Sequence, residues 1–219
     1  MIKLEQIEKT YEKHGQAVHA LEDVNLHLPK GGFLAVTGPS GSGKTTLMNI
    51  LGCLDRPTTG KYLLEGTTVE GLGGAAAADI RNRKIGFIFQ SFNLIGSMSA
   101  LENVELPLVL RGESRKSRRQ KALEALARVG LQNRAAHRPA ELSGGQQQRV
   151  AIARVLAAQP PLILADEPTG NLDGVTAREI LPSLRQLHQE VQTIVMITHD
   201  DGIAAAAPRQ MRMEQGRLS

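Results

Sequence analysis

A glycine-rich segment between a short apolar run and a helical stretch constrains the fold of this chain more than any other feature. Residues Phe33–Thr37 are typical of a buried strand, and residues Thr45–Gly52 have helical character and end on a glycine. Between them stand, in chain order, Gly38, Pro39, Ser40, Gly41, Ser42, Gly43 and Lys44, followed by Thr45. A strand that turns through glycines into a helix directs backbone amides and the positive helix end toward one point, which suits phosphate groups.

The glycine-rich segment fits the pattern G-x-x-x-x-G-K-S/T, in which the lysine reaches the β- and γ-phosphates of a nucleotide. We expect Lys44 to take that place and the Thr45 hydroxyl to bind Mg²⁺. A glycine-rich turn without a ligand is the alternative, and the pattern arises by chance in roughly one chain in a hundred of this length. Its position between a strand and a helix favours a nucleotide-binding phosphate loop.

Two carboxylates follow another apolar run. Leu162–Ala165 predicts a buried strand that ends in Asp166 and Glu167. In a phosphate-loop protein, Asp166 is placed to hold Mg²⁺, directly or through water. Glu167 is placed to orient or deprotonate the attacking water. Two acidic residues in a turn are common, so this interpretation depends on the phosphate loop.

Apolar runs and helical stretches alternate along the chain. Half-buried strands are predicted at Ile2–Gln6 and Val24–Leu28, and buried strands also at Ile85–Phe89 and Ile194–Ile197. Helical spacing dominates residues 91–160, and another helix is predicted from Val175 to Gln189. The pattern predicts an α/β fold in a single domain, 1–219: a mostly parallel sheet flanked by helices, an antiparallel β part, and a helical subdomain inserted at about 91–160.

Bulk properties indicate where such a chain works. No segment approaches the roughly 18 consecutive apolar residues that span a bilayer. The single cysteine, Cys53, cannot form an intramolecular disulfide. The net charge of +4 fits several anionic partners, but the basic segment 111–121 lacks the interleaved aromatic residues of a nucleic-acid surface. We therefore expect a cytoplasmic chain without a nucleic-acid partner, whose membrane role comes through another protein.

A second group of small residues, Leu142-Ser143-Gly144-Gly145-Gln146, opens a predicted helix. Small residues at a helix start again direct backbone amides toward an anion. The chain therefore has two predicted phosphate-facing segments.

These motifs resemble those of the ABC ATPases in type and order, and the resemblance covers essentially the whole chain. It implies an ATPase that uses ATP and Mg²⁺. The resemblance implies that Tyr11 stacks on adenine and that residues 38–46, including Thr46, form the phosphate loop. It implies that Gln90 contacts Mg²⁺ and the attacking water, and that His199 senses the γ-phosphate. It also implies that Asn171-Leu172-Asp173 forms a loop that crosses a dimer interface. The resemblance also implies a head-to-tail homodimer, in which Ser143, Gly144, Gly145 and Gln146 of one subunit bind the γ-phosphate held by the other.

Longer strings narrow the resemblance to the branch that serves macrolide exporters and lipoprotein-release complexes. They are residues 47–57, 86–90, 102–107 and 137–139. That branch implies an integral membrane permease with a large extracytoplasmic domain, a peripheral position on the inner face of the cell membrane, and export or extraction of a peptide, antibiotic or lipoprotein-like substrate. The alternatives are a cell-division-type ATPase that regulates an envelope process without transport, a soluble non-transport ABC ATPase, and a non-catalytic regulator. Gly174 and Glu214-Gln215-Gly216 depart from the usual pattern.

The resemblance further implies a groove after Gln90 that receives a short helix of the permease. Phe92 and Leu94 are expected to be its apolar anchors, and packing of both into the helical subdomain is the alternative. Cys53, His19, His137 and His188 show no metal-ligand spacing and are expected to be structural.

Overall fold

The computed structural model describes residues 1–13, 15–174, 176–177, 182, 187–188 and 192–219, and its strands form two sheets. The larger sheet has the order β10-β9-β3-β8-β7-β6, in which β9, β3, β8, β7 and β6 are parallel neighbours. Its strands are β3 (Phe33–Thr37), β6 (Ile85–Phe89), β7 (Leu162–Asp166), β8 (Thr193–Ile197), β9 (Arg209–Glu214) and the antiparallel β10 (Arg217–Leu218). The smaller sheet is antiparallel, with the order β2-β1-β4-β5: β2 (Gln16–Leu28), β1 (Ile2–Lys13), β4 (Thr59–Leu64) and β5 (Thr67–Thr68).

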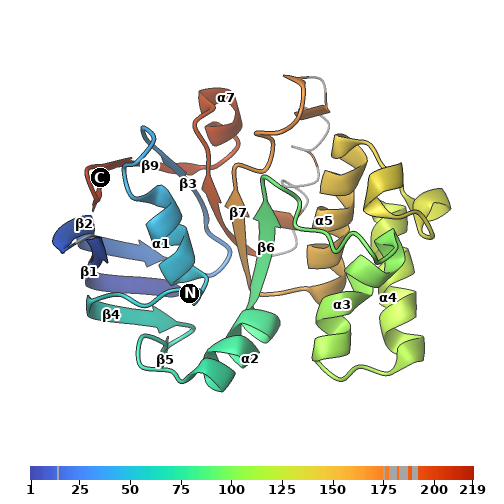
Figure 1. The fold of residues 1–219 in the computed structure, drawn as a ribbon, viewed down its shortest axis with the longest axis horizontal. Coiled ribbons are helices and arrows are strands. Elements are labelled where there is room, and N and C mark those ends of the chain that lie inside the picture. Colours follow the sequence, from blue (N-terminus) through green and yellow to red (C-terminus); the bar gives the residue numbers. More distant parts are fainter. Residues whose placement is uncertain (14, 175, 178–181, 183–186, 189–191) are drawn as a thin grey trace.

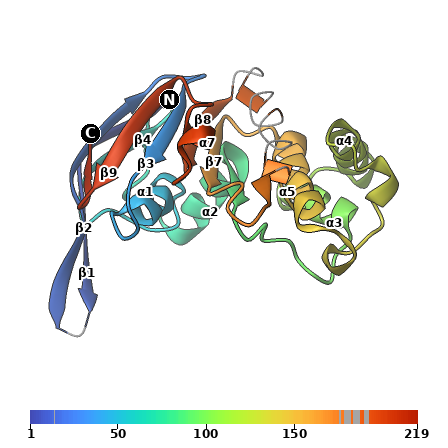
Figure 2. The same cartoon turned by 90° about the horizontal axis from the view of Figure 1, so that it is seen from above.

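The helices gather on both sides of the larger sheet (Figure 1). α3, α4 and α5 lie at one end of the molecule and the antiparallel sheet at the other, as both views show (Figure 2). The described elements between β6 and β7 are all helical, where the sequence has helical spacing. The helices are α1 (Lys44–Leu51), α2 (Gly74–Lys84), α3 (Ala100–Leu110), α4 (Arg115–Arg128), α5 (Gly144–Ala158) and α7 (Asp201–Ala204), with 3₁₀ turns at Gln132–Arg134 and Pro139–Glu141.

Two hydrophobic cores lie on opposite faces of the larger sheet. Ala35, Ile163 and Met196 belong to the core that includes α3, α4 and α5. Their neighbours along the strands, such as Leu34 and Val195, belong to the core that includes α1 and the antiparallel sheet. Successive side chains of a strand point to opposite faces, so a sheet covered on both faces requires continuous apolar runs. This arrangement confirms the predicted fold class.

The parallel order brings the carboxyl ends of four strands to one edge of the sheet. Gly38 follows β3, Gln90 follows β6, Glu167 follows β7, and Thr198 and His199 follow β8. In open α/β sheets, ligands bind outside these carboxyl ends.

The structure also contains elements that local patterns did not predict. β1 and β2 extend as an exposed hairpin beyond the predicted strands, and β4, β5, β9 and β10 carry too few buried residues to give a clear period. The alanine run 75–78 forms the start of α2, which has no buried residue. Most of the helix predicted at 175–189 lies outside the described residues. Among the helices of the described chain, none is long and apolar enough to cross a membrane.

Candidate functional site

A cavity of about 470 Å³ opens at the carboxyl edge of the parallel sheet. It brings together residues from segments far apart in the chain. Eleven expected site residues line it: Gly38, Ser40, Gly41, Gly43, Lys44, Thr45, Thr46, Gln90, Asp166, Glu167 and His199.

The phosphate loop has a backbone that only glycine adopts without strain. Gly38 has a φ of 143° and Gly43 a φ of 107°. A Cβ at Gly43 would lie 2.5 Å from the carbonyl oxygen of Ala20, so a side chain is excluded by contact as well. Gly43 is also the N-cap of α1, a helix described in full, in which no side chain caps the first turn. The first amides of α1 are therefore available to an anionic ligand.

The Lys44 side chain turns back over the loop. Its Nζ donates to the carbonyl oxygens of Gly38 at 2.9 Å and Pro39 at 2.7 Å, and lies 3.4 Å from the Ser42 hydroxyl. These are weak neutral acceptors for an ammonium group, so phosphate oxygens can replace them with stronger charge-assisted bonds.

The acidic end of β7 meets the end of β8 in the cavity. Burial, and next the neighbouring Glu167 carboxylate, raise the pKa of Asp166, while Lys44 opposes that shift. Glu167 accepts from the His199 backbone amide at 3.3 Å, and its Oε1 lies 2.8 Å from the His199 Nδ1. The imidazole and the carboxylate are thus already paired at the cavity wall.

The donor set of the cavity fits Mg²⁺. Thr45, Gln90 and Asp166 offer a hydroxyl oxygen, an amide oxygen and a carboxylate oxygen. Mg²⁺ prefers oxygen ligands, and in nucleotide sites it binds a few protein side chains together with the phosphates of the substrate. The raised pKa of Asp166 indicates a half-buried negative charge that a cation would stabilise. In the part of the chain that the structure describes, no three His, Cys, Asp or Glu side chains form a metal site by themselves.

The segment Ser143–Gln146 lies outside the cavity, at the start of α5. Ser143 is the N-cap: its hydroxyl accepts from the Gln146 amide at 3.3 Å, and the Gln146 side chain accepts from the Ser143 amide at 3.0 Å. Asp173 also lies outside, where it accepts from the amide and hydroxyl of Thr176. Tyr11, Pro39 and Ser42 do not line the cavity either, although Pro39 and Ser42 belong to its loop.

The cavity also contains residues that the sequence patterns missed. Val18, His19 and Ala20 of β2 and Ile197 of β8 line it. His19, which the sequence indicated as structural, is one of these lining residues, and its Nδ1 lies 3.1 Å from the Thr10 hydroxyl. The pairing of β1 with β2 skips Ala20, since Lys9 pairs with Leu21 and Thr10 with His19. A bulge of this kind redirects side chains and leaves no local sequence signal.

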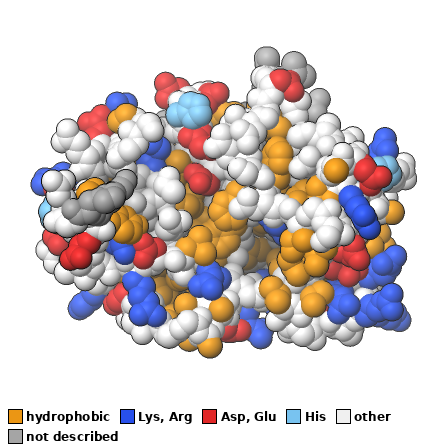
Figure 3. Space-filling view, in the orientation of Figure 1, with side chains coloured by type: hydrophobic (Ala, Val, Ile, Leu, Met, Phe, Trp, Pro, Cys, Tyr) orange, Lys and Arg blue, Asp and Glu red, His pale blue; other side chains and the backbone are white. Residues whose placement is uncertain are grey.

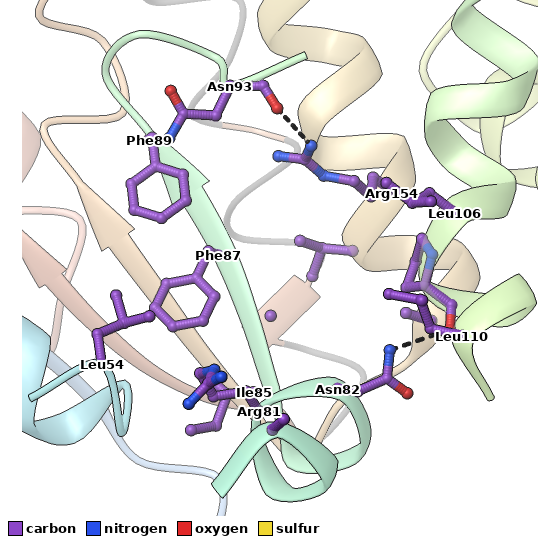
Figure 4. Close-up of a pocket in the computed structure, with 15 residues that line it drawn as sticks. Leu54, Arg81, Asn82, Ile85, Phe87, Phe89, Asn93, Leu106, Leu110 and Arg154 are labelled. Atoms are coloured by element: carbon purple, nitrogen blue, oxygen red, sulfur yellow. Dashed lines mark hydrogen bonds between the residues drawn. The ribbon is translucent and has the colours of Figure 1, made fainter. Parts of the chain in front are cut away.

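A second hollow, apolar and about 450 Å³ in volume, lies between β6 and α3 (Figures 3 and 4). Phe87 and Phe89 stack along one wall with ring centroids 5.2 Å apart, and Leu106 and Leu110 form the opposite wall. We call this hollow the β6–α3 groove. Its other lining residues are Leu54, Ala78, Arg81, Asn82, Ile85, Gly86, Asn93, Pro107, Arg154, Val155 and Ala158.

Phe92 and Leu94 do not line the β6–α3 groove. Leu94 packs against the core around α5, and a Cβ on Gly144 would lie 3.7 Å from the Phe92 ring. The packing of Leu94 favours the alternative, in which both side chains pack into the helical subdomain, and their role as anchors for a permease stays a prediction. Phe92 and Asn93 have left-handed backbones, and the Arg154 guanidinium donates hydrogen bonds to both of their carbonyl oxygens.

Comparison with known proteins agrees with this geometry. Residues 21–170 match the family described as ABC transporter. The lipoprotein-releasing system ATP-binding protein LolD of Chromohalobacter salexigens is 47% identical over all of this chain and 93% of its own length. The macrolide export ATP-binding/permease protein MacB of Hyphomonas neptunium is 47% identical over 100% of this chain, which spans 34% of that protein.

A solved structure shows the same fold. The dimeric post-hydrolysis state of the ATP-binding cassette MJ0796, a protein of Methanocaldococcus jannaschii, bound to ADP and phosphate, superposes with a TM-score of 0.93 at 45% identity. The alignment covers 100% of this chain and 97% of that chain. By its motifs, its fold and these identities, the chain belongs to the ABC transporter ATP-binding proteins and is an ATPase with ATP as substrate and Mg²⁺ as cofactor.

Proposed function

We propose that two copies of this chain close head to tail over ATP and that each active site combines two subunits. Lys44 and the loop amides hold the β- and γ-phosphates, and Tyr11 stacks on the adenine. Thr45, Gln90 and Asp166 hold Mg²⁺, which neutralises charge on the phosphates. Glu167 accepts a proton from the attacking water, and His199 and Gln90 orient the γ-phosphate and the water.

The observation that carries this proposal is the separation of two phosphate-facing segments. Lys44, Gln90, Asp166, Glu167 and His199 share one cavity, whereas the N-terminus of α5 lies outside it. A helix start with small residues is suited to an anion, and a second copy would bring its own Ser143–Gln146 to the open side of the cavity. The dimeric structure of the similar cassette supports this arrangement. We also propose that residues 1–219 form one domain with the helical subdomain inserted at about 91–160.

A mixing experiment tests the composite site. Lys44→Ala removes the cation that neutralises the transferring phosphoryl group, and Ser143→Arg blocks the segment contributed in trans, so each variant alone should be inactive. A mixed dimer retains one intact site, formed by the phosphate loop of the Ser143→Arg subunit and the α5 start of the Lys44→Ala subunit. Partial recovery of ATP hydrolysis on mixing is the expected result. No recovery, with both variants folded and dimer formation shown, would refute the head-to-tail site.

We further propose that the β6–α3 groove receives a helix of an integral membrane permease with a large extracytoplasmic domain. The groove is apolar and its edges are exposed: Leu54 is 51% and Leu110 is 70% accessible to solvent. The similar LolD is named for lipoprotein release and the similar MacB for macrolide export, and MacB joins its cassette to a permease. This supports a place on the cytoplasmic face of the membrane and the export or extraction of a peptide, antibiotic or lipoprotein-like substrate.

A further inference from the structure

We propose that Lys9 and Asp55 form a clamp that fixes the ring of Tyr11 for stacking on the base of the nucleotide. The inference rests on the proposed function, in which Tyr11 is the stacking residue. Lys9 and Asp55 are positioning residues in this proposal, because they act on the nucleotide only through the tyrosine.

Tyr11 stands next to the nucleotide cavity without lining it. Its cross-strand partner on β2 is Val18, which lines the cavity and is 47% exposed. The side chain of Thr46, another cavity residue, acts to lower the pKa of Tyr11, against the larger effects of burial and Asp55. Tyr11 is 37% exposed, so a flat ligand can reach it.

Three contacts hold this ring. The Tyr11 hydroxyl donates to Oδ2 of Asp55 at 2.7 Å. The ammonium of Lys9 donates to Oδ1 of the same carboxylate at 2.8 Å and to the Arg56 carbonyl oxygen at 2.8 Å. The same Nζ lies 4.7 Å from the centroid of the Tyr11 ring, within the range of a cation–π contact.

Burial and hydrogen bonding distinguish this cluster from a fully exposed surface ion pair. The Lys9 side chain is only 13% exposed and that of Asp55 is 31% exposed. Burial alone would raise the pKa of Asp55, but hydrogen bonds from Lys9, Tyr11 and the Arg56 amide outweigh it and lower that pKa. Burial, and next the bond to Asp55, raise the pKa of Tyr11, so the phenol keeps its proton and donates at neutral pH.

The clamp fixes both the orientation and the free face of the ring. The ammonium lies over one face of the Tyr11 ring, so in this proposal the base stacks on the opposite face. The bond to Asp55 stops the ring from sampling other rotamers, so less conformational freedom is lost when a nucleotide binds. Asp55 stands in the segment just after α1, so the clamp ties the stacking ring to the helix that begins with the phosphate loop.

Other contacts join the same two segments and should keep the fold intact without the clamp. The Thr10 amide donates to the Thr58 hydroxyl at 3.0 Å, and the Thr58 amide donates to the Glu8 carbonyl oxygen at 2.8 Å. The Thr59 hydroxyl donates to the Glu8 carboxylate at 3.1 Å.

The test measures Kd for ADP and for inorganic tripolyphosphate, which has no base, by calorimetry on the full chain. Tyr11→Ala should raise the Kd for ADP about tenfold, since base stacking on an aromatic ring contributes roughly that factor or more. Lys9→Met and Asp55→Ala should each raise it about threefold. Asp55→Asn keeps an acceptor and should retain most of the affinity. Lys3→Met removes an exposed lysine from the same strand and is the matched control, with no change expected.

Two comparisons decide the outcome. In the Tyr11→Ala background, Lys9→Met should have no further effect on ADP, and none of the clamp variants should change the Kd for tripolyphosphate. The clamp would be overturned if Lys9→Met weakened ADP binding equally in the wild type and in Tyr11→Ala. Wild-type affinity for ADP in both Lys9→Met and Asp55→Ala would also overturn it. If Lys9→Met or Asp55→Ala loses thermal stability, Tyr11→Phe is measured in its place. Tyr11→Phe removes only the hydroxyl oxygen that binds Asp55, and it should raise the Kd for ADP. Wild-type affinity in Tyr11→Ala would refute the stacking and the clamp together, whereas wild-type affinity in Lys44→Ala would refute the nucleotide site itself.

Discussion

His199 and Glu167 meet across the ends of two neighbouring strands, with the Nδ1 of His199 2.8 Å from Oε1 of Glu167. The Glu167 amide also donates to the carbonyl oxygen of Ile197 on β8 at 2.9 Å. Glu167 has a left-handed backbone with a φ of 44°, a conformation that costs a non-glycine residue about 1 kcal/mol or more. The end of β8 therefore holds the carboxylate in an orientation that β7 alone would not maintain.

Glu167→Gln should bind ATP and hydrolyse it very slowly. The amide keeps the shape of the carboxylate but cannot accept the proton, and a general base contributes about a hundredfold or more to such a step. The ATP-bound dimer should accumulate, and size-exclusion chromatography with Mg·ATP would detect it. A purely monomeric variant at saturating ATP would contradict the proposed sandwich.

His199→Ala should reduce turnover with little effect on the Kd for ATP or on the melting temperature. The imidazole is exposed, with 70% of the side chain accessible, so its loss creates no cavity in the core. We expect a loss of at least tenfold in kcat, since Glu167 loses its side-chain partner and the γ-phosphate loses a contact. Steady-state ATP hydrolysis measures kcat, and a wild-type value would show that the His199–Glu167 pair has no catalytic part.

Asp166→Asn should raise the melting temperature of the nucleotide-free chain while abolishing Mg²⁺-dependent hydrolysis. Burial raises the pKa of Asp166, so the folded state disfavours its charged form at neutral pH. At pH values between the ordinary pKa of an aspartate and the raised pKa of Asp166, the folded chain holds a proton that the unfolded chain has released. The contribution of Asp166 to the free energy of unfolding therefore grows as the pH falls through this range. Melting curves from neutral to mildly acidic pH should show this increase in the wild type and a smaller one in Asp166→Asn. Identical pH dependence of the melting temperature in the wild type and in Asp166→Asn would contradict a raised pKa of Asp166.

Leu110→Glu should weaken permease binding without affecting basal ATP hydrolysis. Leu110 is a wall of the β6–α3 groove and is 70% exposed, so a charge there disturbs the docking surface and not the core. Leu123→Glu, an exposed leucine of α4 outside the groove, is the control. Leu94→Glu should instead lower the melting temperature, because Leu94 packs against the core. Co-purification with the permease separates the cases, and a Leu110→Glu variant that still binds fully would rule out the groove as the docking site.

Local sequence patterns were sufficient where function depends on consecutive residues. Lys44 stands between a buried strand and a helix, and Asp166 ends an apolar run, so both could be located from the order of residue types. The parallel sheet then brought these ends together, as continuous apolar strands require.

Features that depend on distant partners could not be predicted in the same way. His19 lines the cavity beside a register shift, where the β1–β2 ladder skips Ala20. Phe87 and Phe89 were interpreted as part of a buried strand. β6 is an edge strand of its sheet, so both aromatic side chains also line the β6–α3 groove, although Phe87 packs against a core as well. Which strand occupies an edge is set by the pairing of the whole sheet, and no short segment of sequence contains that information.

The last hairpin of the chain supports the phosphate loop. The Gly216 amide donates to the Ser42 carbonyl oxygen at 2.9 Å, and a Cβ on Gly38 would overlap the Met213 carbonyl oxygen. During synthesis, residues 38–45 leave the ribosome long before residues 209–218. A nascent chain arrested before Arg209 would therefore carry an unsupported phosphate loop, and photolabelling with a nucleotide should be weak until the hairpin emerges. The order of translation would thus delay ATP binding until nearly all of these residues have been made.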